Sequence, residues 1–151
     1  MPTDTSPGAV VCPAPARECG CYLDPRLMTI ESPTVADARV QTAIDMITRR
    51  YVEPLQARDV ARAVGFSVSH FGRRFKQETG LSFKAFLLRL RVTQARNLLF
   101  FDPIVRIKQV AAAAGYGDRP VLTFTRDFRK YWGCPPSQCQ KSGRLARFVN
   151  K

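Results

Sequence analysis

The middle of this chain is repeated in its second half. Residues 61–67 return as residues 111–117, fifty positions later, with Gly65 and Gly115 in equivalent places. Residues 71–76 return as residues 124–129, and the offset is now 53 positions because the stretch after the second glycine is longer. A glycine between two segments of helical periodicity is typical of a turn between helices. Each copy therefore predicts a helix, a turn and a second helix.

Apolar residues spaced three and four positions apart extend the helical prediction to most of the chain. Ser67 and Ser82 are suited to cap helices, Gly80 and Gly133 are suited to end them, and Pro120 is expected in the first turn of its helix. We find no period-two alternation long enough to predict a strand. We expect an all-α fold of about seven helices, near residues 35–51, 57–64, 68–78, 83–99, 106–113, 119–132 and 137–141.

Proline content divides the chain into an arm and a helical domain. Six of the eleven prolines precede residue 34, so residues 1–34 are expected to form an irregular N-terminal arm. The helical domain is expected at residues 35–142, with two helix-turn-helix subdomains at 35–81 and 101–142. A long central helix at 82–100 would connect them, and residues 143–151 would form a basic C-terminal tail.

The net charge of +12 is concentrated where the repeat lies. Residues 1–38 carry a net charge of −3, and residues 39–151 carry +15. Such an excess favours a polyanion as partner, and nucleic acid is the default candidate. No helix pairs a wholly basic face with an unbroken apolar one, no run approaches about 18 apolar residues, and no leader pattern is present. We therefore expect a cytoplasmic, nucleoid-associated protein without a membrane partner.

The second helix of each copy has an inner and an outer face. At roughly 100° per residue, Phe71 and Phe75 share the inner face with Val68, while Arg73 points outward. Phe124 and Phe128 repeat the inner pair, and Arg126 repeats the outer arginine. An outward arginine on a helix in the major groove can pair with guanine, and hydroxyls and lysines can contact phosphates. The predicted DNA-contacting residues are Ser67, Ser69, Gly72, Arg73, Lys76, Leu122, Thr123, Thr125, Arg126 and Lys130.

The connecting helix sets the distance between these two faces. About seventeen residues form a rod of roughly 25 Å, which places the two recognition helices about one DNA turn, or ~34 Å, apart. A rigid link of this length requires the DNA to bend or one unit to engage only partly.

The stretch from about Pro54 to Gln140 resembles the DNA-binding domain of AraC/XylS-type transcriptional regulators. Its first half matches at Asp59-Val60-Ala61, Gly65-Phe66-Ser67, His70-Phe71, Arg73, Phe75-Lys76, Gly80, Ser82-Phe83, Arg91, Ala95 and Leu98-Leu99. Its second half matches at Ile107, Val110-Ala111, Gly115-Tyr116, Asp118, Phe124, Arg126, Phe128, Gly133, Pro136 and Ser137. This chain departs from the family pattern at Gly72, which has no side chain, and in the longer second turn.

The resemblance implies a two-lobed domain that reads asymmetric promoter sites in successive major grooves, often as an activator that contacts RNA polymerase. The base-reading positions would be Ser69, Gly72 and Arg73, then Leu122, Thr123, Thr125 and Arg126. Val121 and Leu122 place apolar groups near the groove, where they would either contact thymine methyls or read no base at all. With only a short arm, the chain is similar to small monomeric activators or to a truncated relative without its effector domain.

Two other classes of function remain as alternatives. A non-specific basic nucleoid protein would use the charge without reading sequence. An enzyme acting on DNA is disfavoured by the single histidine, His70, and by the lack of a suitably spaced carboxylate pair. We therefore expect no catalytic residues and no cofactor. Metal or redox sensing is a minor alternative. Cys12, Cys19 and Cys21 lack a fourth local ligand, which Cys134 or Cys139 would have to supply, and free thiols are the main interpretation of all five cysteines.

Overall fold

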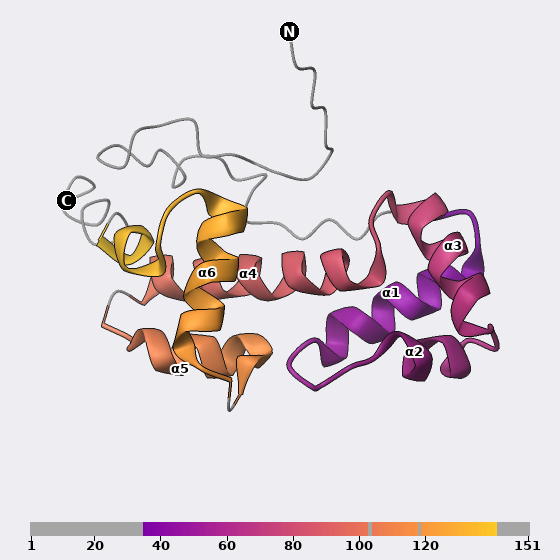
Figure 1. Cartoon of the computed structure of the whole chain (residues 1–151), viewed down its shortest axis with the longest axis horizontal. Helices are drawn as coiled ribbons and strands as arrows, with labels where there is room; N and C mark the ends of the chain where they lie inside the picture. Colours follow the sequence, from indigo (N-terminus) through magenta and orange to yellow (C-terminus); the bar gives the residue numbers. More distant parts are fainter. Residues whose placement is uncertain (1–34, 103, 118, 142–151) are drawn as a thin grey trace, which may run out of the picture.

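The computed structural model describes residues 35–102, 104–117 and 119–141, and every regular element within those ranges is helical (Figure 1). The expected all-α class is confirmed. The expected arm and tail, together with Cys12, Cys19 and Cys21, lie outside the described residues. The elements in chain order are α1 (Ala38–Arg50), α2 (Ala57–Ala63), α3 (Val68–Thr79), α4 (Phe83–Phe101), α5 (Ile107–Ala111), the wide π-type turn η3 (Ala112–Tyr116), α6 (Val121–Trp132) and a helical turn over residues 136–141.

Side-chain caps fix where several helices begin. The Asp37 carboxylate accepts from the Arg39 amide at 3.0 Å, so α1 begins at Ala38 and not at residue 35 as expected. Ser67 and Ser82 cap α3 and α4 as predicted, with each Oγ accepting from the amide three residues later at 3.3 Å. Each such cap satisfies one of the helix's first N–H groups.

The second copy departs from the expected helix boundaries. Helix α5 ends at Ala111, and the chain continues through η3 instead of a regular helix to residue 113. Pro120 is extended, with ψ 134°, and precedes α6 as its N-cap residue. The prediction that Pro120 falls within the first turn is therefore wrong, because the longer turn delays the helix until Val121.

Two apolar side chains of the helices, Val68 and Leu98, are exposed. Val68 is 52% exposed because it opens α3, one turn before Phe71 and beyond the edge of the core. Leu98 is 40% exposed because it lies about 100° around α4 from the fully buried Leu99. The prediction that Val68 faces inward is therefore wrong.

Helix α4 is shared by two separate hydrophobic cores. Its first half contributes Phe83, Phe86, Leu87 and Leu90 to the core of the first unit, which contains α1, α2 and α3. Its second half contributes Val92, Ala95 and Leu99 to the core of the second unit, which contains α5, η3 and α6. At roughly 100° per residue these two sets lie on nearly opposite sides of α4. The two units therefore pack against different faces at different ends of one helix.

The two units also touch directly. The Arg91 guanidinium on α4 donates to the carbonyl oxygens of Tyr51 and Glu53, both at 2.8 Å. Gly115, in the turn of the second unit, has a positive φ of 84° and lies against Tyr51, Val52 and Arg91. The turn of the second unit is thus fitted against the loop that follows α1.

Candidate nucleic-acid interface

Helix α3 has one buried face and one exposed face. Phe71 and Phe75 are fully buried, with ring centroids 5.2 Å apart. Ser69, Gly72, Arg73 and Lys76 are all exposed, and their spacing of three and four residues places them on one stripe of the helix. The structure therefore brings these four predicted contact residues together. Ser67 lies exposed at the start of this stripe, and its hydroxyl keeps one donor in addition to its capping bond.

Arg74 serves a different purpose from its neighbour Arg73. Its Nη2 lies 2.9 Å from Asp37 Oδ2 and 3.6 Å from Glu78 Oε1. The hydrogen bond from Arg74, followed by that from the Arg39 amide, lowers the pKa of Asp37 below its ordinary value. Arg74 therefore orients α3 against the start of α1, whereas Arg73 remains directed to solvent.

Helix α6 repeats this division. Phe124 and Phe128 are fully buried, and the Phe124 ring packs against Tyr116 with centroids 5.2 Å apart. Arg126 and Lys130 are exposed, whereas Thr123 and Thr125 are half-buried beside the inner face. Leu122 is 77% exposed. All five predicted residues of α6 reach the surface, although the two threonines reach it only in part.

The outer stripes of α3 and α6 differ in chemistry at equivalent positions. Arg73 corresponds to Arg126, and Lys76 corresponds to Arg129, so both helices offer two cations. The first turn, however, presents Ser69 on α3 and Leu122 on α6. The side chain missing at Gly72 is present in α6 as Thr125. The two stripes therefore have the same charge pattern but different capacity to read base edges.

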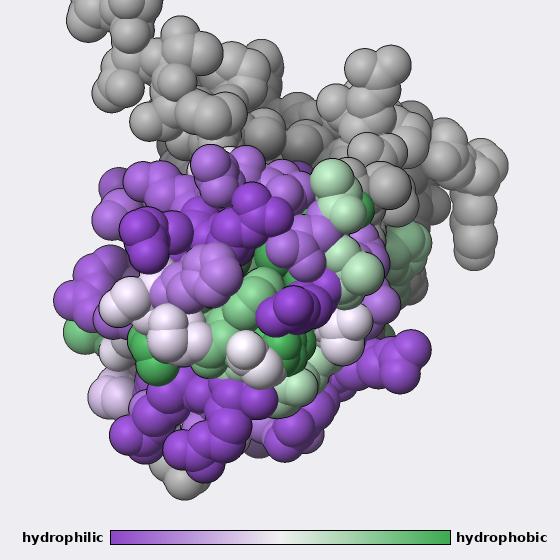
Figure 2. Space-filling view, turned by 90° about the vertical axis from the view of Figure 1, so that its right-hand side faces the viewer, coloured by the Kyte–Doolittle hydropathy of each residue, from purple (hydrophilic) through white to green (hydrophobic). Residues whose placement is uncertain are grey.

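Hydrophilic side chains cover most of the end of the molecule where α3 lies, and they surround a small hydrophobic patch (Figure 2). This distribution follows from the inward position of the α3 phenylalanines. Two exposed apolar side chains occupy the first turns of the recognition helices: Val68 on α3 and Leu122, a predicted contact residue, on α6.

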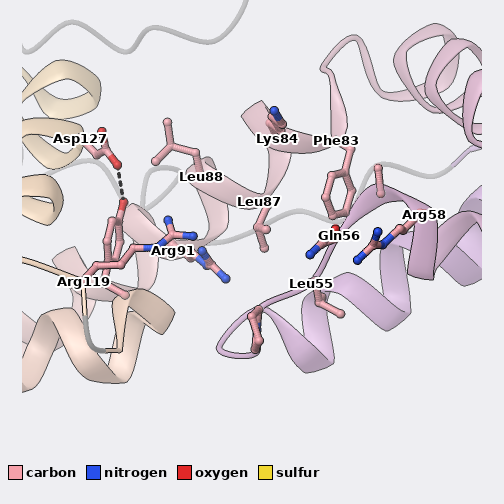
Figure 3. Close-up of a pocket in the computed structure, with 13 residues that line it drawn as sticks. Leu55, Gln56, Arg58, Phe83, Lys84, Leu87, Leu88, Arg91, Arg119 and Asp127 are labelled. Atoms are coloured by element: carbon pink, nitrogen blue, oxygen red, sulfur yellow. Dashed lines mark hydrogen bonds between the residues drawn. The ribbon is translucent and has the colours of Figure 1, made fainter.

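A hollow of about 720 Å³ lies between parts of the two units beneath α4 (Figure 3). Residues of α2, α4, the second turn and α6 line it. Four of these residues are cations: Arg58, Lys84, Arg91 and Arg119. Asp127 contributes a carboxylate to the lining, and its Oδ2 accepts from the Tyr116 hydroxyl at 3.1 Å.

Burial and neighbouring charges shift the pKa values of two side chains that line this hollow, Arg91 and Tyr116. Burial, and then the nearby charge of Arg119, lower the pKa of Arg91. Burial, and then the charge and hydrogen bond of Asp127, raise the pKa of Tyr116 well above its ordinary value. Tyr116 therefore stays neutral at physiological pH and acts as a fixed donor to Asp127.

Sequence reasoning missed this hollow. Arg58, Lys84 and Arg119 are far apart in the sequence, and no helical period links them. The only available signal was the longer second turn, which contains Arg119.

Among the described residues, no group of three His, Cys, Asp or Glu side chains is placed to hold a metal ion. No helix in the same ranges is both long and apolar enough to cross a membrane.

Two helix-turn-helix units with exposed basic recognition helices define a double helix-turn-helix DNA-binding domain. A model of the helix-turn-helix domain family matches residues 60–142, which is more than half of the chain. The chain belongs to this family, and its domain is of the AraC/XylS type, as the sequence motifs indicated.

Curated relatives and a solved structure agree with this assignment. The Msm operon regulatory protein of Streptococcus mutans is 29% identical over 111 residues, which cover 74% of this chain and 39% of that protein. The lactose operon transcription activator of Staphylococcus xylosus is 29% identical over 114 residues, or 76% of this chain and 39% of that protein. The chain thus spans about two fifths of the length of these relatives.

The fold also matches the DNA-binding domain of AdpA, a global transcriptional factor solved in complex with a target DNA. The two superpose with a TM-score of 0.67 at 23% identity, over 74% of this chain and 97% of the AdpA chain. The arrangement of two units on one shared helix is therefore a recurring fold.

Proposed function

We propose that this chain is the DNA-reading part of a transcription regulator, and that it inserts α3 and α6 into successive major grooves of promoter DNA. The observation that carries the proposal is the exposed basic stripe that recurs on both recognition helices. Arg73 and Arg126 occupy equivalent positions, each opposite a fully buried pair of phenylalanines. Because α3 and α6 belong to one chain and carry different outer side chains, a monomer would bind an asymmetric DNA site.

The spacing of the two helices supports the same proposal. α3 and α6 lie near opposite ends of α4 (Figure 1), and the 19 residues of α4 span about 28 Å. The widths of the helices add to that length and bring the separation close to one turn of DNA, about 34 Å. The contact between Gly115 and the loop after α1 keeps the separation fixed.

The role proposed for each residue follows from its position. Arg73 and Arg126 pair with guanines, and Leu122 packs against thymine methyls. Ser67, Ser69, Lys76, Thr123, Thr125 and Lys130 bind phosphates or base edges and set the register. Gly72 lets the backbone of α3 approach the groove closely.

The name of the lactose operon transcription activator supports activation as the biological outcome. We propose that the chain activates transcription in the cytoplasm, at the nucleoid, and that RNA polymerase is its protein partner. An in vitro transcription assay on a promoter that carries the bound motif would test this role. A fall in transcript level on addition of the chain would identify a repressor instead.

Selection of bound sequences from random duplexes at about 150 mM salt tests DNA reading directly. The expected result is an asymmetric motif with two blocks of preferred bases about ten base pairs apart. The Arg73→Ala variant should lose preference within one block and the Arg126→Ala variant within the other. Enrichment of no motif would show a non-specific DNA-binding protein and would reject the proposal.

A further inference from the structure

The hollow between the units carries an excess of positive charge from separate segments. Arg58 lies in the first turn of α2, Lys84 in the first turn of α4 and Arg119 in the turn before α6, and all three are exposed. Asp127 is engaged by Tyr116. Arg58 Nε lies 3.9 Å from Asp59 Oδ1, but both side chains are largely exposed, so this pair holds the arginine weakly.

One of these cations, Arg119, faces a fourth positive charge in the unbound protein. Arg91 is buried behind the hollow, and the nearby Arg119 disfavours its charged form. Figure 3 shows Gln56 and Arg58 on one side of the space and Arg91 and Arg119 on the other. An anion placed between the two sides would relieve this repulsion. The side chains therefore fit a negatively charged occupant.

The longer turn of the second unit supplies one of these cations. Six positions separate Gly65 from Phe71 in the first copy, whereas nine separate Gly115 from Phe124 in the second. Arg119 lies within the additional stretch and lines the hollow. Phe124 and Phe128 remain buried despite the extra residues. The longer turn therefore changes the lining of the hollow and leaves the core intact.

DNA bound by both recognition helices would bring its backbone to this place. When successive major grooves on one face of a duplex receive α3 and α6, the phosphates between those grooves face the middle of the protein. The hollow lies beneath α4, with residues of the first unit on one side and residues of the second unit on the other (Figure 3). Leu55 and Leu88, which are half-buried in its lining, offer apolar surface to the sugars beside those phosphates.

We propose that the hollow binds the DNA backbone between the two grooves, with Arg58, Lys84 and Arg119 as its phosphate ligands. This inference rests on the proposed function and deepens it. Contacts of this kind give affinity without base preference, because phosphates carry no sequence information. The hollow thus supplies a third point of attachment between the two readers.

The first test measures how binding of the full chain to a fluorescent duplex depends on salt between about 50 and 200 mM. The variant Arg58→Gln/Lys84→Gln/Arg119→Gln should reduce the slope of log K against log salt by about 2 to 3. A matched variant, Arg49→Gln/Arg62→Gln/Lys141→Gln, removes three exposed charges outside the hollow lining. Equal slopes for the two variants would overturn the proposal. Circular dichroism melting confirms that both variants remain folded.

The second test locates the phosphates. Uncharged methylphosphonates replace the backbone phosphates between the two blocks of the selected motif. They should weaken binding of the wild-type chain by a larger factor than binding of the hollow variant, because the variant no longer contacts those phosphates. Equal weakening of both proteins would place the contacts elsewhere and overturn the proposal.

These outcomes remain distinct from failure of the proposed function. If the wild-type chain enriches no motif, sequence reading fails, but the salt comparison still tests the hollow on any duplex. If the motif is found and remains unchanged in the hollow variant while affinity falls, both inferences are supported.

Discussion

Gly115 lies so close to Tyr51 that a Cβ atom at position 115 would stand 2.8 Å from the Tyr51 carbonyl oxygen. The same oxygen accepts from Arg91 Nε at 2.8 Å. Three segments therefore meet at one carbonyl group: the loop after α1, the middle of α4 and the turn of the second unit. This junction fixes the position of one recognition helix relative to the other.

Substitution at the two turn glycines should separate backbone strain from crowding at this junction. Gly65 has a φ of 73° but no atom within 4 Å of the place a Cβ would take, whereas Gly115 has both a positive φ and close neighbours. Gly65→Ala should lower the free energy of unfolding by about 1–2 kcal/mol. Gly115→Ala should lower it by about 1–3 kcal/mol more, because the added methyl overpacks the junction. Urea denaturation of both variants is the measurement, and equal losses would contradict this account.

Arg73 and Arg74 are neighbours of equal charge with different surroundings. Arg73→Ala should weaken binding to the selected motif by about 1–3 kcal/mol and relax preference at one base pair. Arg74→Ala should leave the motif unchanged and lower the free energy of unfolding slightly, through loss of the pair with Asp37. Fluorescence anisotropy and denaturation of the two variants provide the comparison. Identical motif changes in both would remove Arg73 from base reading.

Gly72 lies in the middle of α3 with nothing within 4 Å of a Cβ position. Gly72→Ala should therefore raise the free energy of unfolding by about 0.5–1 kcal/mol, because glycine is a poor helix former. If α3 approaches the groove closely at this point, the same variant should bind its motif more weakly despite its greater stability. Melting and anisotropy measure the two effects, and unchanged affinity would show that the backbone does not need this proximity.

The two recognition helices differ most in their first turns, where α6 has the apolar Leu122 at the position of the polar Ser69 on α3. Leu122→Ala should change the free energy of unfolding by less than about 0.5 kcal/mol, because the side chain is mostly exposed. It should also remove a thymine preference from the block read by α6. A selected motif identical to that of the wild-type chain would exclude Leu122 from readout.

The pair between Asp37 and Arg74 predicts a dependence of stability on pH. The lowered pKa of Asp37 means that its charged form favours the folded state. This contribution is fully present above the unfolded value, about 3.9, and is lost as the pH falls through the lower folded value. Asp37→Asn retains a capping side chain but not the charge. The stability difference between wild type and Asp37→Asn should therefore shrink in denaturation curves below about pH 4, and a constant difference would contradict the prediction.

The sequence predicted the parts of this molecule that depend on residues close together in the chain. Helical periodicity alone was enough to predict the buried positions of Phe71, Phe75, Phe124 and Phe128. Ser67 and Ser82 cap helices because capping involves only three residues. Val68 was misplaced because its exposure depends on where the core ends, which periodicity does not encode.

The junction and the hollow depend on distant parts of the chain. Arg91 was found as part of a family motif, but its bonds to Tyr51 and Glu53 cross about forty positions. Arg58 and Arg119 come together only after both units have packed on α4. The stripe on α3 was therefore predictable in full, whereas the cationic lining between the readers was not.

Shared use of α4 has a consequence for how such a duplicated chain can change over time. Neither unit has a core of its own, because each core includes buried residues from the same helix α4. Loss of either unit would leave apolar residues of α4 open to water, so a single-headed reader cannot be made by simple deletion. We therefore expect the two copies to unfold together, whereas their exposed outer stripes can diverge without disturbing either core.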